Sequence, residues 1–90
     1  MPQEPLQELL ENDFKVYVDV NEDRLADGRI LPRSVVWEDG GRYEIDTVMD
    51  IRKAASLKAG GAGTRYTVRI NGKVTHMWLE ETRWFVERRV

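Results

Sequence analysis

Alternating apolar and polar residues predict a two-stranded antiparallel hairpin over residues 65–80, RYTVRINGKVTHMWLE. At its centre, Asn71-Gly72 supplies two consecutive residues that accept a positive φ, which a type I′ turn requires. A two-residue turn places Ile70 opposite Lys73 and so sets the register. The other expected pairs are Val68 with Thr75, Tyr66 with Met77, Arg69 with Val74, Thr67 with His76, and Arg65 with Trp78. We expect the rest of the chain to be organised around this hairpin.

The two faces of the hairpin differ in character, because successive side chains of a strand point to opposite sides. The face that we assign to the core carries Tyr66, Val68, Ile70, Met77 and Leu79. The other face carries Arg65, Arg69, His76 and Trp78, and we predict that these four residues point outward as a binding surface. Arg65 would lie opposite Trp78, where a guanidinium over an indole ring is favourable.

The first clear strand covers residues 14–20, FKVYVDV, with Phe14, Val16, Val18 and Val20 on one face. Residues 21–28 are polar and end in Asp27-Gly28, so they predict a loop. A brief extended piece at residues 29–31 then meets Pro32. Proline cannot donate to a strand ladder, so we place Pro32 at a strand start or on an edge strand.

A further hairpin and a last strand are indicated by the rest of the pattern. Residues 34–37 and 42–45 flank Glu38-Asp39-Gly40-Gly41 and predict a second hairpin. Residues 83–87, RWFVE, predict the last strand, with Phe85 on one face and Trp84 and Val86 on the other.

Residues 46–58 fit two readings. As a strand, the segment would put Tyr43, Ile45, Met49 and Ile51 on one face, and a bulge near Thr47 would turn Val48 to that face as well. As a helix, it would begin at Asp46, present Val48, Ile51 and Ala55 as a stripe, and end at Gly60. We expect a strand to about residue 52 and a turn or helical turn to residue 58, with the full helix as the alternative. Residues 59–63, AGGAG, would be a flexible connector.

Six short strands with glycine turns predict an all-β fold, with one short helix as an option. The expected architecture is a small antiparallel β-barrel or strongly bent sheet of five to six strands, of SH3-like type. Residues 14–90 would form this single domain. Residues 1–13 would precede it as a short helix or a disordered segment, since Leu6, Leu9 and Leu10 have helical spacing.

The composition narrows the class of protein. Ninety residues suffice for one domain. The absence of cysteine excludes disulfides, thiolate metal sites and thiol catalysis, and it is typical of a reducing cytoplasm. No apolar run approaches the roughly 18 residues that span a bilayer, and the first residues are acidic. We therefore expect a cytoplasmic protein without a membrane partner.

The charge is unevenly distributed. Residues 1–50 hold 13 acidic and 5 basic side chains, whereas residues 51–90 hold 3 acidic and 9 basic ones. We expect strands of the two halves to interleave so that these charges largely pair, with a basic face as the other outcome.

A series of residues also resembles a known pattern. In order, these are Trp37, Gly41-Arg42, Tyr43-x-Ile45, Val48-Met49, Arg65-Tyr66-x-Val68 and Trp84, over about two thirds of the chain. The series resembles a group of small bacterial proteins of unknown function. The resemblance implies an SH3-like small barrel and, for some related domains, an association with DNA-handling proteins. It implies no catalytic residue.

No motif specifies a chemical reaction. His76 is the single histidine, and no carboxylate is placed beside it to orient a general base. Glu44, Asp46 and Asp50 would share one face of a regular strand, where acidic residues commonly guard an edge. The sequence AGGAGTR lacks the Lys-Ser/Thr ending of a phosphate-binding loop. We predict a protein that is not an enzyme and that uses no cofactor or metal.

The remaining prediction is a binding or adaptor module whose most favoured partner is a protein, because aromatic and arginine side chains serve as interface anchors. The alternative is single-stranded nucleic acid, bound by the face of Arg65, Arg69, His76 and Trp78, since such proteins place basic side chains beside aromatic platforms.

Overall fold

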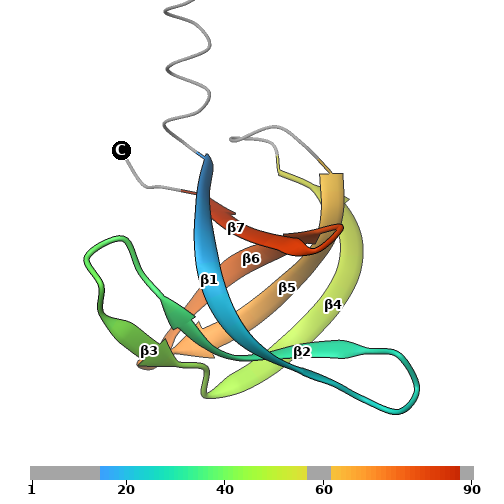
Figure 1. Ribbon diagram of the computed structural model, residues 1–90, viewed down its shortest axis with the longest axis horizontal. Helices are drawn as coiled ribbons and strands as arrows, with labels where there is room; N and C mark the ends of the chain where they lie inside the picture. The colour runs from blue at the N-terminus through green and yellow to red at the C-terminus, as the bar shows by residue number, and fades with distance from the viewer. Residues whose placement is uncertain (1–14, 57–61, 88–90) are drawn as a thin grey trace, which may run out of the picture.

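The computed structural model describes residues 15–56 and 62–87, which form one seven-stranded sheet (Figure 1). The strands are β1 (Lys15–Arg24), β2 (Ile30–Val36), β3 (Arg42–Glu44), β4 (Thr47–Ala55), β5 (Ala62–Ile70), β6 (Lys73–Glu80) and β7 (Arg83–Glu87). Their order is β3-β2-β1-β7-β6-β5-β4, and all neighbours are antiparallel. The described residues contain no helix, and therefore none long and apolar enough to cross a membrane. The all-β prediction is confirmed, with seven strands where we expected five to six.

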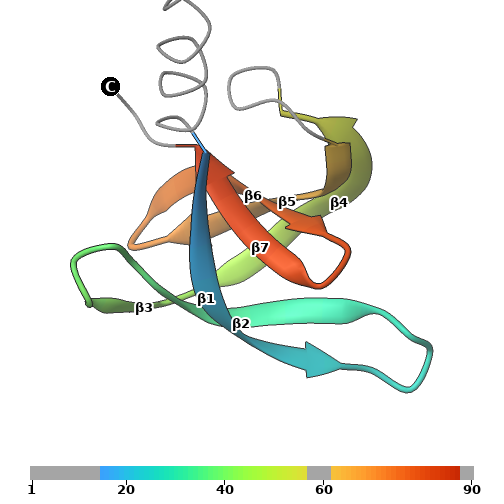
Figure 2. The same cartoon turned by 45° about the horizontal axis from the view of Figure 1, so that its top comes forward.

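The sheet curls strongly on itself, so that the two ends of the strand order approach each other as a half-barrel (Figures 1 and 2). Two consecutive residues between β3 and β4 hold these ends together. The Ile45 amide donates to the Arg33 carbonyl of β2 at 2.9 Å, and the Asp46 amide donates to the Arg69 carbonyl of β5 at 2.8 Å. The segment Ile45-Asp46 thus connects β2 and β5 through backbone hydrogen bonds at one end of the barrel.

The central hairpin forms as predicted. β5 and β6 pair in the expected register, including Tyr66 with Met77 and Arg65 with Trp78. Asn71 has a φ of 52° and Gly72 a φ of 77°, which are the two positive values that a type I′ turn requires. The local sequence therefore determines this part of the fold.

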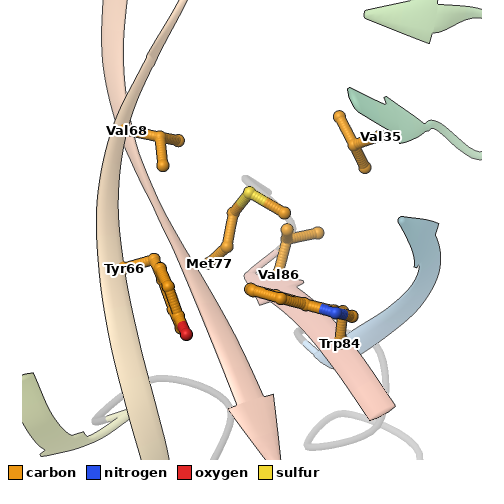
Figure 3. Packing of buried hydrophobic residues seen from close by; sticks show 6 residues of the cluster. All are labelled: Val35, Tyr66, Val68, Met77, Trp84 and Val86. Atoms are coloured by element: carbon orange, nitrogen blue, oxygen red, sulfur yellow. The ribbon is translucent and has the colours of Figure 1, made fainter. Parts of the chain in front are cut away.

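The core fills the concave side of the curled sheet (Figure 3). Its fully or nearly buried residues are Val35, Tyr66, Val68, Met77, Trp84 and Val86. The Tyr66 and Trp84 rings lie 4.8 Å apart between centroids. The Tyr66 hydroxyl donates to the Ile30 carbonyl, and the Trp84 indole donates to Glu22 Oε1 at 2.7 Å. Burial raises the pKa of the Tyr66 hydroxyl, with a smaller effect from the Glu22 charge. The apolar face predicted for the hairpin is therefore the core face.

One prediction about the first half of the chain is wrong, and another holds in one of its two forms. The predicted loop at residues 21–28 begins later, because β1 continues to Arg24 and pairs with β2 along residues 30–32. Pro32 lies inside β2 and not at its start, but β2 is an edge strand at this residue, which was the other option. The register shifts beside it, between Asn21 and Glu22, and β3 pairs only with residues 34–36 of β2. Pro32 is tolerated because no strand needs its missing N–H on that side.

The segment after β3 also differs from the expectation. β4 is a strand through Ala55, so the turn predicted for residues 53–58 is wrong over 53–55, and no helix forms over residues 46–56. The bulge lies between Val48 and Asp50, not at Thr47. Val48 packs against the core, whereas Met49 and Ile51 are 47% and 38% exposed. The expectation that Met49 and Ile51 would lie in the core is therefore wrong.

The predicted connector is shorter than expected. Ala62 and Gly63 belong to β5, while residues 57–61 lie outside the described part, as do residues 1–14 with the expected N-terminal segment. Gly63 is required where it stands, because a Cβ there would lie 2.6 Å from the Leu79 carbonyl oxygen. A backbone oxygen at this distance cannot move aside cheaply.

The two halves of the chain lie side by side and do not interleave. β3, β2 and β1 form one side of the sheet, and β7, β6, β5 and β4 form the other, joined by the β1–β7 pair. Ion pairs stay mostly local, as in Arg33 with Asp23. The ion pair of Lys15 with Glu80, at 3.3 Å, crosses between the two sides. The prediction of interleaved charges is therefore wrong.

Candidate functional site

The four residues of the predicted binding face lie on the outer surface of β5 and β6, but they are not equally accessible. Arg69 and His76 are exposed, Arg65 is half-buried, and Trp78 is only 3% exposed. Trp78 lies on the outer face as predicted, but the prediction that it is accessible to a partner is wrong. This indole ring has no free face on which a base or a partner side chain could stack.

Trp78 is buried because aromatic side chains from three strands line up across the outer face. The register places Tyr17 of β1 beside Phe85 of β7, and Phe85 beside Trp78 of β6. The Trp78 and Phe85 rings stack at 5.4 Å with an angle of 4°, and Tyr17 meets Phe85 edge-on at 6.0 Å. His76 meets Trp78 edge-on at 5.9 Å. This row is a second apolar cluster that stabilises the sheet from outside.

Charged side chains surround one end of the aromatic row. The Arg83 guanidinium lies 3.5 Å from the Tyr17 ring centre, and Lys15 Nζ lies 4.6 Å from the Phe85 ring centre. Glu80 accepts a hydrogen bond from the Tyr17 hydroxyl at 2.8 Å and forms an ion pair with Lys15. The Tyr17 hydrogen bond lowers the pKa of Glu80, and Lys15 lowers it further. These side chains are engaged with one another.

At the other end of the row, two buried donors have no acceptor. Arg65 Nε and Trp78 Nε1 are both inaccessible and make no hydrogen bond. Arg65 lies directly opposite Arg52 of β4, so two like charges face each other across neighbouring strands. Such a pair is destabilising unless an anion lies close by, and Asp50 supplies one, 2.7 Å from Arg52.

The three carboxylates that the sequence suggested as a group are dispersed. Glu44 is in β3, Asp46 lies between β3 and β4, and Asp50 is in β4, so the expectation of one shared strand face is wrong. Asp46 Oδ2 accepts a hydrogen bond from the Gly72 amide, and Asp50 is held by Arg52. In the described ranges no three His, Asp or Glu residues are grouped as metal ligands.

An open apolar hollow lies at the mouth of the half-barrel. There the β2–β3 hairpin and the β5–β6 turn lie at the same end of the molecule in both views (Figures 1 and 2). The hollow has a volume of about 440 Å³. Its lining includes Val35, Trp37, Tyr43, Ile70, Lys73 and Thr75. We call it the mouth groove.

The mouth groove combines apolar walls with charges at its rim. Trp37, Tyr43 and Ile70 are half-buried, so each ring or chain keeps an accessible surface, while Val35 forms a fully buried floor. Lys73, at the start of β6, and Asp39, in the loop between β2 and β3, are exposed in the lining. A concave apolar surface with a few polar groups is the usual form of a binding site.

Sequence reasoning did not select the residues of the mouth groove as a site. The sequence placed Trp37 and Tyr43 in the second hairpin. Tyr43 pairs with Val35, and Trp37 follows Val35 by two residues, so both aromatic side chains lie on the same face of this hairpin. The missing information was tertiary, because Ile70 and Lys73 come from another hairpin.

A second hollow, of about 330 Å³, lies where β1 extends past the start of β7. Its lining includes Asp19, Glu22 and Arg83. Glu22 is bonded to Trp84 and Arg83 stacks on Tyr17, so two of its polar groups already have partners.

The fold and the mouth groove together define a class: a small all-β half-barrel with one apolar hollow at its open end. Comparison with protein-family models, curated proteins and solved structures gives no match.

Proposed function

We propose that this protein is a small, non-catalytic binding module that takes up an apolar anchor side chain of a protein partner in the mouth groove. The observation that carries the proposal is the hollow itself, in which Trp37, Tyr43 and Ile70 are only half covered. Aromatic side chains are enriched at interface centres because they bury a large area at a small entropic cost.

The size and charges of the mouth groove suit one or two side chains of an extended segment. Its 440 Å³ fits a single large aromatic or branched side chain. Lys73 and Asp39 in the lining favour a segment that carries charges of both signs near the anchor. The SH3-like resemblance and the cysteine-free composition support a cytoplasmic adaptor of this kind.

The proposal is tested by selecting twelve-residue peptides from a displayed library on the wild-type protein and measuring their affinity by calorimetry. We expect enriched peptides to share an aromatic or aliphatic anchor and to bind in the micromolar range. Thr75→Arg, which fills the hollow, should weaken this binding at least tenfold.

The matched control is Val74→Arg, which places the same side chain one residue away on the opposite face, where Val74 is 54% exposed. It should leave peptide affinity unchanged, and thermal unfolding should show both variants folded. Equal binding by the two arginine variants, or no enriched anchor, would contradict the proposal.

Single-stranded nucleic acid is the second candidate, favoured by Arg52, Arg65 and Arg69 on the outer face of β4 and β5. With Trp78 covered, binding would depend on phosphate contacts. Fluorescence anisotropy of a mixed-sequence oligonucleotide at several salt concentrations tests this candidate. Replacing Arg65 and Arg69 by alanine should reduce the salt slope by about 1.4, since each phosphate contact contributes about 0.7. A slope that does not change with these replacements would rule this face out.

A further inference from the structure

β4 leaves one of its two edges without a strand partner among the described residues. It ends the strand order, and its known partner is β5. At the opposite end of the order, β3 has only three residues, whereas β4 has nine. Alternate amide and carbonyl groups of an edge strand point away from the sheet and can accept a further strand. The longest unpaired edge of the described sheet therefore belongs to β4.

The free edge of β4 is also unusually apolar at its middle. Met49 is 47% exposed and Ile51 38%, and they are two of the four large apolar side chains that the described surface leaves most open. Edge strands are normally blunted by charges or shortened. Ile51 lies at the midpoint of β4, with four residues on either side.

The charges beside Ile51 are self-complementary. Asp50 and Arg52 flank it, and they bond to each other at 2.7 Å within the strand. If a second β4 runs antiparallel with Ile51 opposite Ile51 of the other copy, each Asp50 lies opposite Arg52 of the other copy. All nine residues then pair, with Thr47 opposite Ala55.

Neighbouring registers do not have this property. If the second strand is centred on Arg52, the two Arg52 side chains oppose each other, and if it is centred on Asp50, the two carboxylates do. Like charges directly opposite each other are destabilising. Arg52 and Arg65 face each other, and Asp50 forms an ion pair with Arg52. The register centred on Ile51 brings the Asp50 carboxylate of the other copy toward these two arginines as well.

We propose that β4 pairs antiparallel with β4 of a second copy of this chain, about a twofold axis at Ile51, so that two half-barrels join into one continuous sheet. This interface uses the edge of β4 and leaves the mouth groove of each copy open, since no residue of β4 lines that groove. The occupant is a second copy because the edge is complementary in charge to itself.

The absence of native cysteine allows a direct test by single-cysteine cross-linking. Ile51→Cys should form an intermolecular disulfide under mild oxidation, because the two Cα atoms would face each other across the axis. Lys53→Cys is the matched control. Its two copies would lie four positions apart along the strands, roughly 13 Å, beyond the reach of a disulfide. Strong cross-linking of Ile51→Cys with little of Lys53→Cys supports the proposal, whereas equal or absent cross-linking overturns it.

Charge variants test the register without a cysteine. Asp50→Arg and Arg52→Asp should each weaken self-association at least tenfold in sedimentation velocity, because each creates like-charged pairs. When the two variants are mixed, opposite charges are restored and dimers should reappear. Wild-type protein that stays monomeric at about 1 mM, or a mixture no more associated than its components, overturns the proposal.

Discussion

At the scale of single residues, the clearest case is Trp78, whose indole ring is covered on the outer face of the sheet. Phe85 stacks on one side of it and His76 meets its edge. A large aromatic side chain buried in this way stabilises the fold through its area and its ring contacts. Trp78 is thus a structural residue, and Arg69 on the same face is not.

Trp78→Ala should therefore lower the free energy of unfolding by about 3 to 5 kcal/mol, as for other buried aromatic truncations. Arg69→Ala, at an exposed position, should change it by no more than about 0.5 kcal/mol. Urea unfolding followed by circular dichroism measures both. A loss below about 1 kcal/mol for Trp78→Ala would mean that the aromatic row does not stabilise the sheet.

Glu80 gives a pH-dependent prediction. Its pKa is lowered in the folded protein, first by the Tyr17 hydroxyl. The folded state thus binds a proton on Glu80 less readily than the unfolded state, and the stabilisation is complete above the unfolded pKa. As the pH falls through the folded pKa, this stabilisation is lost.

Tyr17→Phe removes the hydrogen bond and should therefore destabilise the protein more at about pH 7 than at about pH 2.5. Urea unfolding at the two pH values measures the difference. Tyr43→Phe is the control, because no described carboxylate bonds to its hydroxyl, and its effect should be the same at both. An equal loss for Tyr17→Phe at both pH values would argue against the role of Glu80.

At the scale of elements, the type I′ turn at Asn71-Gly72 sets the register of the β5–β6 hairpin. A Cβ added at Gly72 would meet nothing within 4 Å, so the requirement for glycine comes from its φ of 77° alone. Gly72→Ala should cost about 1 kcal/mol. Asn71→Gly, which keeps a positive φ accessible, should cost much less.

Chemical denaturation of the two turn variants tests this prediction. The loss for Gly72→Ala should be the larger of the two. Both variants change an exposed residue of the same turn, so the comparison isolates the effect of the backbone conformation. Equal losses would mean that the positive φ of residue 72 does not disfavour a side chain there.

The hairpin was predictable from sequence because its turn and its alternation lie within sixteen consecutive residues. The break between β3 and β4 was not, because it depends on hydrogen bonds from Ile45 and Asp46 to strands distant in sequence. The exposure of Met49 was missed for a related reason. A bulge reverses the alternation for the residues that follow it. The position of the bulge must therefore be known before these residues can be assigned to a face of the sheet.

The site was less predictable than the fold. Arg65 and Trp78 do lie opposite each other, as the register required, but cation–π contacts on this face come from Lys15 and Arg83. The burial of Trp78 depends on the turn at Glu81, where a φ of 56° directs β7 back along β6 and sets Phe85 opposite Trp78. The mouth groove depends on the meeting of two hairpins, which no local pattern reveals.

At the scale of the whole molecule, two contiguous segments each form their own side of the sheet, and the β1–β7 pair joins them. That pair connects Lys15 with Glu87, so it has the largest separation in sequence of any strand pair described here. Pairs of this kind close the longest loops and tend to form late. The β5–β6 hairpin, by contrast, is local.

Folding kinetics should reflect this difference. Val86→Ala lies in the β1–β7 pair, opposite Val16, and should mainly speed unfolding, whereas Val68→Ala in the β5–β6 hairpin should also slow folding. Stopped-flow measurements over a range of urea concentrations give both rates. Similar slowing of folding by both variants would place the β1–β7 pair in the transition state.

The place of β7 in the sheet has a consequence for synthesis on the ribosome. β1 is the first described strand to emerge, yet its second neighbour, β7, is the last described strand to be made. Until residues 83–87 have left the ribosome, Val16 and Val18 of β1 lack the β7 residues with which they pair. The nascent chain therefore carries an open, apolar strand edge until β7 has been made, which is the kind of surface that chaperones protect.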